Sequence, residues 1–208
     1  QVDGVHIRVL AGVSMARAAV FAANLGLSGL EFAHGIPGSV GGGLYMNAGA
    51  YGGEIRQVAV RTEFLDQEGT HHTLEGEEQG FGYRKSAFTG TSRVIVAGTF
   101  ALTPGAPEEI RQRMQELMAR RKASQPLDLP SAGSTFKRPV GGYAAALIEQ
   151  AGLKGTQIGG AAVSAKHAGF VVNLGGATES DVLALIAHVQ KRVLETSGIS
   201  LEPEVVRL

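Results

Sequence analysis

Hydrophobic and polar residues alternate at the start of the chain, where Val5, Ile7 and Val9 occupy every second position. A period of two predicts a strand with one buried face. A helical pattern follows, whose apolar face consists of Met15, Ala18, Ala19, Ala22 and Leu25. Ser14 precedes this pattern as an N-cap and Gly26 ends it. The chain is therefore predicted to begin as strand, turn and helix.

The next segment breaks both periods. Residues 35–53 read GIPGSVGGGLYMNAGAYGG, with too many glycines for a regular element, so an irregular loop is expected. Beyond it, short β-like runs at 58–64 and 70–74 flank the turn DQEG at 66–69 and predict a hairpin. A buried type of strand, RVIVAGTFALTP, follows at 93–104.

Pro104, Gly105, Ala106 and Pro107 favour neither a strand nor a helix interior, and a helical pattern follows over 108–123. We therefore expect two domains, 1–104 and 105–208. The apolar stripe of this helix is Ile110, Met114, Leu117 and Met118. Its C-terminal end carries three basic residues, Arg120, Arg121 and Lys122. They could simply interact favourably with the negative end of the helix dipole, or they could bind an anion, and both interpretations stay open.

The rest of the chain mixes short elements. Strands are expected at 134–137, 158–163, 169–173 and 199–208, with a short helix at 143–150. Thr178, with an acid three residues later, caps a helix whose stripe is Val182, Leu185, Ile186, Val189 and Val193. Because strands and helices do not alternate strictly, the predicted fold class is α+β.

The composition excludes several classes of function. The 208 residues carry 19 Lys and Arg against 19 Asp and Glu, which argues against a basic nucleic-acid binder. Cysteine is absent, which excludes disulfides, thiolate metal sites and a cysteine nucleophile. The apolar runs are shorter than the roughly 18 to 20 residues of a membrane span. We expect a cytoplasmic protein without a membrane or nucleic-acid partner. The chain starts in a strand without Met, so we expect a missing N-terminus.

Glycine clusters in the loop at 35–53 and would let backbone N–H groups approach an anionic or planar ligand. The segment lacks the Lys-Ser/Thr of a P-loop and the G-x-G-x-x-G of a dinucleotide fold. Ligand binding and a structural role both stay open. The six histidines show neither H-x-x-x-H nor H-x-H spacing, so no metal site is predicted.

Ionisable candidates are scattered. Arg84 lies in a loop between Tyr83 and Lys85 and suits bidentate carboxylate binding, although most such arginines are merely solvated. Ser134 lacks the G-x-S-x-G elbow of a hydrolase nucleophile, and an ordinary loop serine is the favoured interpretation on position alone. Glu204 stands in an apolar closing segment, exposed or turned into a site. Position by position, these residues indicate only an α+β protein with a ligand loop.

Taken together, five ordered blocks resemble one family. They are GLSGLEFAHGIPGSVGGGLYMNAGAYGGE at 26–54, FGYRKSAF at 81–88, RKASQPLDLPSAGSTFKRP at 121–139, AGLKGTQIGGAAVSAKHAGFVVN at 151–173 and LEPEV at 201–205. The family is that of the UDP-N-acetylenolpyruvoylglucosamine reductases, or UDP-N-acetylmuramate dehydrogenases, flavoenzymes of bacterial peptidoglycan precursor synthesis. Nearly the whole chain is covered.

The resemblance implies a fold and a reaction. Residues 1–104 would form the second half of a two-part FAD-binding fold of the vanillyl-alcohol-oxidase (PCMH) type, and 105–208 an α+β substrate domain. NADPH would reduce FAD, and the flavin would pass hydride to the enolpyruvyl group of the substrate. Ser134 matches the proton donor to the α-carbon, and Arg84 and Glu204 match the residues that stabilise the enolate.

The resemblance also implies binding residues. Cofactor contacts are expected from the glycine-rich loop at Ile36, Pro37, Gly38, Gly41, Gly42, Asn47 and Gly49. Substrate contacts are expected at Tyr83, Lys122, Lys137, Arg138 and His167. The segment between 93 and the proline-rich linker leaves no room for the tyrosine-bearing loop of one subtype, so this chain resembles the subtype without it.

One departure from the family stands at the start of the chain. The family begins with a subdomain that holds the FAD diphosphate and adenine, and nothing before Gln1 represents it. We therefore expect a truncated chain with doubtful flavin affinity, acting as a monomer. Two alternatives remain: a related flavin oxidoreductase with a different substrate, and a non-catalytic nucleotide-sugar-binding fragment.

Overall fold

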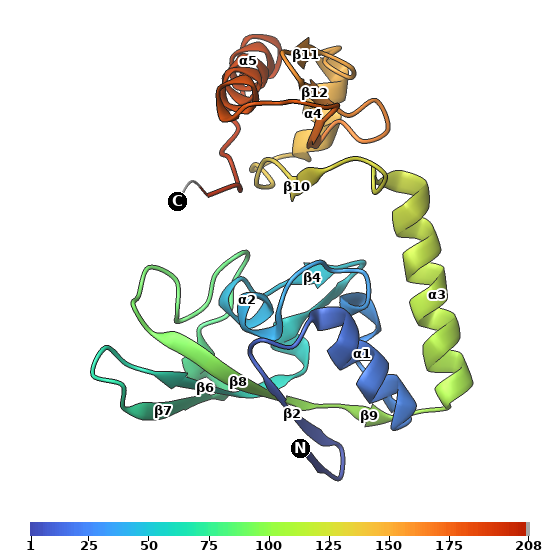
Figure 1. Cartoon of the computed structure of the whole chain (residues 1–208), viewed down its shortest axis with the longest axis vertical. Helices are drawn as coiled ribbons and strands as arrows, with labels where there is room; N and C mark the ends of the chain where they lie inside the picture. Colours follow the sequence, from blue (N-terminus) through green and yellow to red (C-terminus); the bar gives the residue numbers. More distant parts are fainter. Residues whose placement is uncertain (207–208) are drawn as a thin grey trace. The chain divides into compact units, whose positions relative to one another are not determined.

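The computed structural model describes residues 1–206 and divides the chain into two compact units, Gln1–Arg121 and Lys122–Leu208. The division falls inside the last turn of helix α3 (Pro107–Ser124), and not at the proline-rich linker that the sequence suggested (Figure 1). The reason is packing, because Ile110 and Met114 of α3 belong to the hydrophobic core of the first unit. Within the described residues, no helix has the length and apolar character needed to cross a membrane.

The first unit is built on a five-stranded antiparallel sheet. Its strands, in spatial order, are β1 (Val2–Asp3), β2 (His6–Leu10), β8 (Val94–Ala101), β6 (Ala59–Leu65) and β7 (His71–Glu75). The predicted first strand and the predicted hairpin are both confirmed. Two small two-stranded sheets accompany it, β3 (Leu27–Ser28) with β9 (Thr103–Pro104), and β4 (Gly49–Ala50) with β5 (Gly53–Glu54).

Helices α1 (Met15–Asn24) and α2 (Val40–Tyr45) pack on one side of this sheet (Figure 1). The predicted cap of α1 is confirmed, because the Ser14 hydroxyl accepts a 3.3 Å hydrogen bond from the Arg17 amide. Leu25 was expected on the buried stripe but is 45% exposed, since it stands one residue beyond the end of the helix. Short 3-10 helices complete the unit at η1 (Glu31–Ala33), η2 (Ile55–Gln57) and η3 (Gly76–Gln79).

Helix α2 corrects the expectation of an irregular segment over 35–53. Ser39 caps this helix, and its hydroxyl accepts a hydrogen bond from the Gly42 amide at 3.2 Å. Val40 and Leu44, four residues apart, are both fully buried. The burial of these two side chains outweighs the low helix propensity of the glycines between them.

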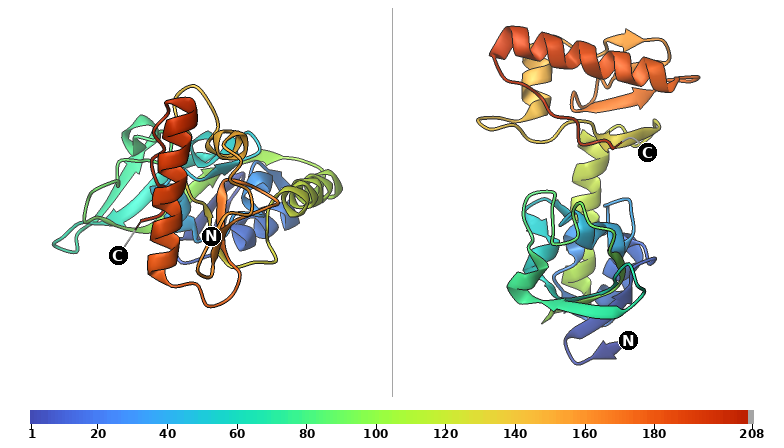
Figure 2. Two further views of the ribbon diagram at one scale, coloured as in Figure 1. Left: turned by 90° about the horizontal axis from the view of Figure 1, so that it is seen from above. Right: turned by 90° about the vertical axis from the view of Figure 1, so that its left-hand side faces the viewer.

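The second unit pairs a four-stranded antiparallel sheet with two helices. The strand order is β10 (Ser131–Ser134), β13 (Phe170–Asn173), β12 (Ala161–Val163) and β11 (Gln157–Ile158), and the helices are α4 (Ala144–Gln150) and α5 (Glu179–Ser197). Helix α5 lies along this sheet, as both views of Figure 2 show. Its predicted stripe is buried at Leu185, Ile186, Val189 and Val193. The α+β class is confirmed.

The closing segment was predicted as a strand over 199–208. Its described part instead makes a single β-bridge, Phe136 with Pro203, followed by one backbone hydrogen bond of 2.8 Å from the Glu204 amide to the Thr135 carbonyl. Pro203 has no N–H to donate, which limits a regular ladder at this point. Residues 207 and 208 lie outside the described part of the chain.

Candidate functional site

Several glycines of the 35–53 segment serve internal packing. A Cβ atom at Gly41 would lie 2.9 Å from the Cβ of Ala11, and one at Gly49 would lie 2.8 Å from the carbonyl oxygen of Gly53. Both distances are shorter than real Cβ contacts, so these positions need glycine whether or not a cofactor binds. The glycine richness of the loop therefore has a structural cause as well as the expected ligand-binding one.

Only a few residues of the same loop are exposed and could contact a ligand. Pro37, Gly38 and Gly42 are exposed, and Ile36 is half-buried. Gly38 has φ +139°, and a Cβ added there would meet nothing within 4 Å. Among the described residues, its N–H has no hydrogen-bond partner. A planar group can therefore approach the backbone at Ile36–Gly38, so these residues fit the flavin expected from the sequence.

The N-terminus of α2 does not offer a phosphate site. The amides of Val40 and Gly41 donate to the carbonyls of Val13 and Ala11 at 2.8 and 2.9 Å. Ser39 satisfies the next donor as the N-cap. Because these donors are used inside the protein, the start of α2 lacks the row of free amides that holds phosphate in a P-loop.

Asn47 ties two loops of the first unit together. The residue is 2% exposed, and its Nδ2 donates to Glu54 Oε2 at 3.0 Å and to the Gly82 carbonyl at 3.1 Å. Its Oδ1 accepts from the Arg56 amide at 2.9 Å. The side-chain amide therefore makes three hydrogen bonds within the protein, and the cofactor contact expected at Asn47 stays a prediction. Its φ of +44° is a conformation that Asn tolerates better than most residues.

The loop at 81–92, which carries Arg84, is attached to α2 at further points. The Ser86 hydroxyl donates to the Tyr45 carbonyl at 2.8 Å, and the Gly90 amide donates to the Tyr45 hydroxyl at 3.3 Å. Arg84 itself is half-buried, has φ +53°, and its guanidinium lies 5.4 Å from the centre of the Tyr83 ring. Left-handed backbone in a bulky residue persists where the surroundings enforce it, often at functional sites.

Ser134 and Glu204 come close together in the second unit. Ser134 ends β10, where it pairs with Phe170, and it is exposed. The next residue, Thr135, accepts the 2.8 Å hydrogen bond from the Glu204 amide. Two candidates far apart in the sequence thus lie on neighbouring segments of one unit, whereas Arg84 belongs to the first unit.

The expected substrate-binding cations are mostly engaged with protein groups. Lys137 forms an ion pair with Glu202, and the Arg138 guanidinium lies 4.0 Å from the centre of the Tyr143 ring. Lys122 is exposed, and its carbonyl accepts a hydrogen bond from Lys166 Nζ at 2.6 Å.

His167 has a different environment. Its ring meets the Phe170 ring edge-on with centroids 4.9 Å apart, and its Nδ1 accepts from the Gly169 amide at 3.2 Å. Burial lowers the pKa of the His167 imidazole below its usual value. A neutral imidazole is favoured near neutral pH, which weakens its expected role as a cation for a diphosphate.

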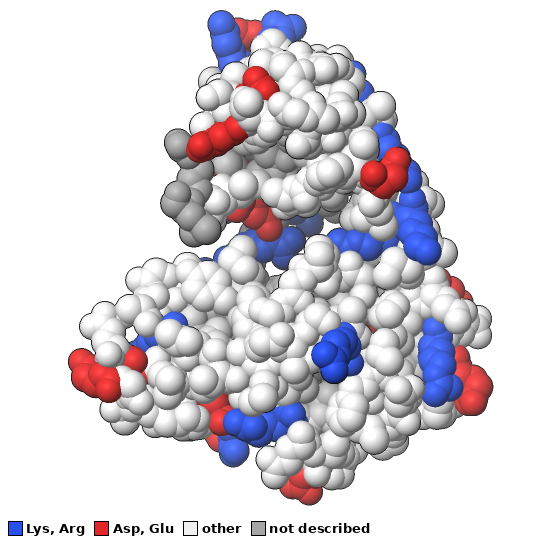
Figure 3. Space-filling model, in the orientation of Figure 1, with Lys and Arg blue, Asp and Glu red and all other residues white. Residues whose placement is uncertain are grey.

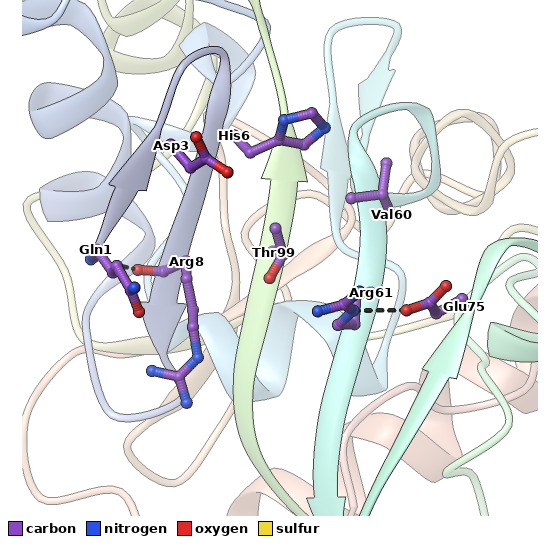
Figure 4. Close-up of a pocket in the computed structure, with 8 residues that line it drawn as sticks. All are labelled: Gln1, Asp3, His6, Arg8, Val60, Arg61, Glu75 and Thr99. Carbon is purple, nitrogen blue, oxygen red and sulfur yellow. Dashed lines mark hydrogen bonds and ion pairs between the residues drawn. The ribbon is translucent and has the colours of Figure 1, made fainter.

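Two cavities are lined by other residues. One of about 390 Å³ opens on the five-stranded sheet and is lined by charged side chains that include Arg8, Arg61 and Glu75 (Figure 4). Another of about 260 Å³ lies in the second unit beside Leu129 and Lys166. Their lining includes none of the predicted catalytic residues. On the face of the first unit drawn in Figure 3, acidic and basic side chains are interspersed.

Comparison with known proteins identifies the family that this chain resembles. The profile described as "UDP-N-acetylenolpyruvoylglucosamine reductase, C-terminal domain" matches residues 125–208, and the profile "FAD binding domain" matches residues 1–75. A UDP-N-acetylenolpyruvoylglucosamine reductase from Levilactobacillus brevis is 57% identical over 179 residues, which cover 86% of this chain and 59% of that protein. One from Limosilactobacillus fermentum is 48% identical over 205 residues, 99% of this chain and 68% of that protein.

A solved structure agrees with these matches. The crystal structure of UDP-N-acetylenolpyruvylglucosamine reductase from Thermus caldophilus has a TM-score of 0.84 and 39% sequence identity, and the match covers 100% of this chain and 75% of that one. The chain thus spans between 59% and 68% of the length of the two sequence relatives named above.

Proposed function

Since the chain belongs to the UDP-N-acetylenolpyruvoylglucosamine reductase family, we propose that it reduces UDP-N-acetylglucosamine enolpyruvate to UDP-N-acetylmuramate, with FAD as cofactor and NADPH as reductant. The observation that carries this proposal is the 2.8 Å backbone link that sets Glu204 beside Thr135, next to Ser134. These are the two residues expected to handle the proton and the enolate in this half of the chain. The product would feed peptidoglycan synthesis, and we propose a cytoplasmic monomer.

The bound flavin would supply hydride to the methylene carbon of the enolpyruvyl group. Ser134 would then protonate the neighbouring α-carbon. A serine hydroxyl is a weak acid, so it can act only toward a strongly basic acceptor, and an enolate α to a carboxylate is such an acceptor. The exposed position of Ser134 at the end of β10 keeps its hydroxyl accessible to substrate.

Arg84 would stabilise the charge that grows on the substrate carboxylate during the reaction. A guanidinium held in place before the reaction strengthens its interaction in the transition state without reorganisation. The hydrogen bonds that attach the 81–92 loop to Tyr45 and Asn47 support this role. Glu204 would orient the hydrogen-bond network around the enolate.

The exposed backbone at Ile36–Gly38 and Gly42 would lie against the flavin, with Gly41, Asn47 and Gly49 supporting the loop from within. For the substrate, Lys122, Lys137 and Arg138 would contribute positive charge toward the diphosphate. Tyr83, stacked with Arg84, would border the enolpyruvyl end.

The test is a turnover assay on the complete gene product with NADPH and UDP-N-acetylglucosamine enolpyruvate. We expect oxidation of NADPH to depend on the substrate and to yield UDP-N-acetylmuramate, identified by a mass two hydrogens greater than that of the substrate. UDP-N-acetylglucosamine, which lacks the enolpyruvyl group, is the control and should not be reduced. NADPH oxidation without that product would favour another flavin oxidoreductase, and binding without turnover would favour a non-catalytic protein.

A further inference from the structure

The C-terminal end of α3 brings two arginines against the glycine-rich loop of the first unit. A Cβ atom at Gly35 would lie 3.1 Å from Arg121 Cδ and 3.3 Å from its Nη1, so the arginine side chain packs directly on this glycine. The Arg120 guanidinium lies 5.1 Å from the centre of the Tyr51 ring. The basic end of the helix is therefore ordered against the loop and does more than complement the helix dipole.

Arg121 is a half-buried charge that meets no carboxylate among residues 1–206. Burial lowers the pKa of its guanidinium, and Tyr51 is close enough to interact with it electrostatically. Within the part of the chain that the structure describes, this guanidinium makes no hydrogen bond or ion pair. Arg8 and Arg61, in contrast, each meet a carboxylate at 2.6 Å. A charge removed from water normally acquires such a partner, so its absence points to a ligand.

Two polar atoms near this end of the helix, on Tyr51 and His34, also lack a hydrogen-bond partner among the described residues. The Tyr51 hydroxyl is buried, and no described group forms a hydrogen bond with it. The Nδ1 atom of His34, directly before Gly35, is buried and likewise lacks a partner among the described residues. Tyr51 also has φ +55°, a strained conformation for a tyrosine. Buried polar groups of native proteins are nearly always paired, so these two unpaired atoms, one on Tyr51 and one on the residue before Gly35, are exceptional.

We propose that Arg121 and the Tyr51 hydroxyl bind a phosphoryl group of a nucleotide ligand. The guanidinium and the phenol both donate hydrogen bonds, which requires an acceptor that carries negative charge. A phosphate has more acceptor oxygens than a carboxylate, so it can accept from both the guanidinium and the phenol. Arg120 adds positive charge next to the ring of Tyr51. The identity of the nucleotide rests on the proposed function, whose substrate and reductant both carry phosphates.

The first experiment measures binding of inorganic pyrophosphate to the 208-residue chain by isothermal titration calorimetry. We expect Arg121→Gln to weaken binding at least about tenfold, because a charge-assisted hydrogen bond is lost. Tyr51→Phe should weaken it by a smaller factor. The matched control is Arg113→Gln on the same helix, whose side chain pairs with Glu116 at 3.4 Å and which should leave binding unchanged. Absence of binding by the unaltered chain, or equal binding by all variants, overturns the proposal.

The same titration with UDP and with 2′-phospho-ADP-ribose identifies the source of the phosphate. Loss of UDP binding in Arg121→Gln assigns the site to the substrate, and loss of the other ligand assigns it to the reductant. If Arg121→Gln weakens neither, the assignment to a nucleotide is wrong. None of these measurements needs flavin or turnover. A chain that binds phosphate but fails the turnover assay would therefore contradict the proposed function alone.

Thermal unfolding separates a binding role of Tyr51 from a structural one. Tyr51→Phe removes only a hydroxyl that has no hydrogen-bond partner among the described residues, so the ligand-free Tm should stay the same or rise. The increase in Tm caused by pyrophosphate should become smaller in this variant. A large fall in the ligand-free Tm would show that the hydroxyl stabilises the fold itself, and this result would overturn the proposed site.

Discussion

Replacing Asn47 tests how the loop that carries Arg84 is held. The Asn47 side chain makes three hydrogen bonds, to Glu54, Gly82 and Arg56, at 2.9 to 3.1 Å. Each contributes about 1 kcal/mol to stability. Alanine at φ +44° costs about another 1 kcal/mol. Asn47→Ala should therefore lower the free energy of unfolding by about 4 kcal/mol.

Urea unfolding followed by circular dichroism measures this loss. With a denaturant dependence of about 2 kcal/mol per molar, the midpoint should fall by about 2 M. Asn47→Gly should lose less than Asn47→Ala, because glycine adopts a positive φ without steric cost. The control is Asn24→Ala, an exposed position with a single 3.4 Å side-chain contact, which should change stability by less than about 0.5 kcal/mol.

A loss below about 1 kcal/mol in Asn47→Ala would refute the reasoning. It would mean that the three hydrogen bonds add little and that the amide of Asn47 is available to a ligand. In the complete gene product, the same variant should also impair turnover more than flavin content, since it displaces the loop that carries Arg84 and leaves the exposed Ile36–Gly38 backbone intact.

Three further predictions concern stability. The ion pair with Arg8 lowers the pKa of Glu63 below its usual 4.5. The pair therefore stabilises the fold above that pH, and its contribution disappears as the pH falls through the lowered pKa. Glu63→Gln should flatten the dependence of Tm on acidic pH, and an unchanged dependence would contradict the pairing. Gly53→Ala should destabilise by at least about 1 kcal/mol in urea unfolding, because its Cβ would lie 2.6 Å from the Phe32 ring, and a neutral effect would disprove the close approach. Thr178→Ala should cost about 1 kcal/mol through loss of the α5 cap, and no change in Tm would count against the capping box.

Local patterns in the sequence predicted much of the fold. Ser14 and Thr178 cap their helices as expected, because a cap depends on residues within one helical turn. The hairpin of β6 and β7 follows from alternation around one turn. Such features are set by neighbours in the chain, which makes them predictable without tertiary information.

Features that depend on distant contacts were harder to predict. Helix α2 forms inside a glycine-rich segment because Val40 and Leu44 are buried by other elements. The division into units after Arg121 depends on where Ile110 packs, and the linker composition alone did not reveal it.

The candidate site shows the same contrast. The resemblance identified Ser134 and Glu204, and the structure brings their chain segments together. The attachment of Asn47 to Gly82 and the uncompensated charge of Arg121 could not be predicted, because both depend on segments that are distant in the sequence. The only local signal was an asparagine among glycines, which is compatible with a positive φ.

The central claim is that Ser134 gives a proton to the substrate and takes no part in reducing the flavin. Stopped-flow spectroscopy of Ser134→Ala in the complete gene product measures the two half-reactions separately. We expect NADPH to reduce the flavin at the unaltered rate, and reoxidation by UDP-N-acetylglucosamine enolpyruvate to slow by about a hundredfold or more. Equal slowing of both half-reactions, or reoxidation at the unaltered rate, would contradict the account.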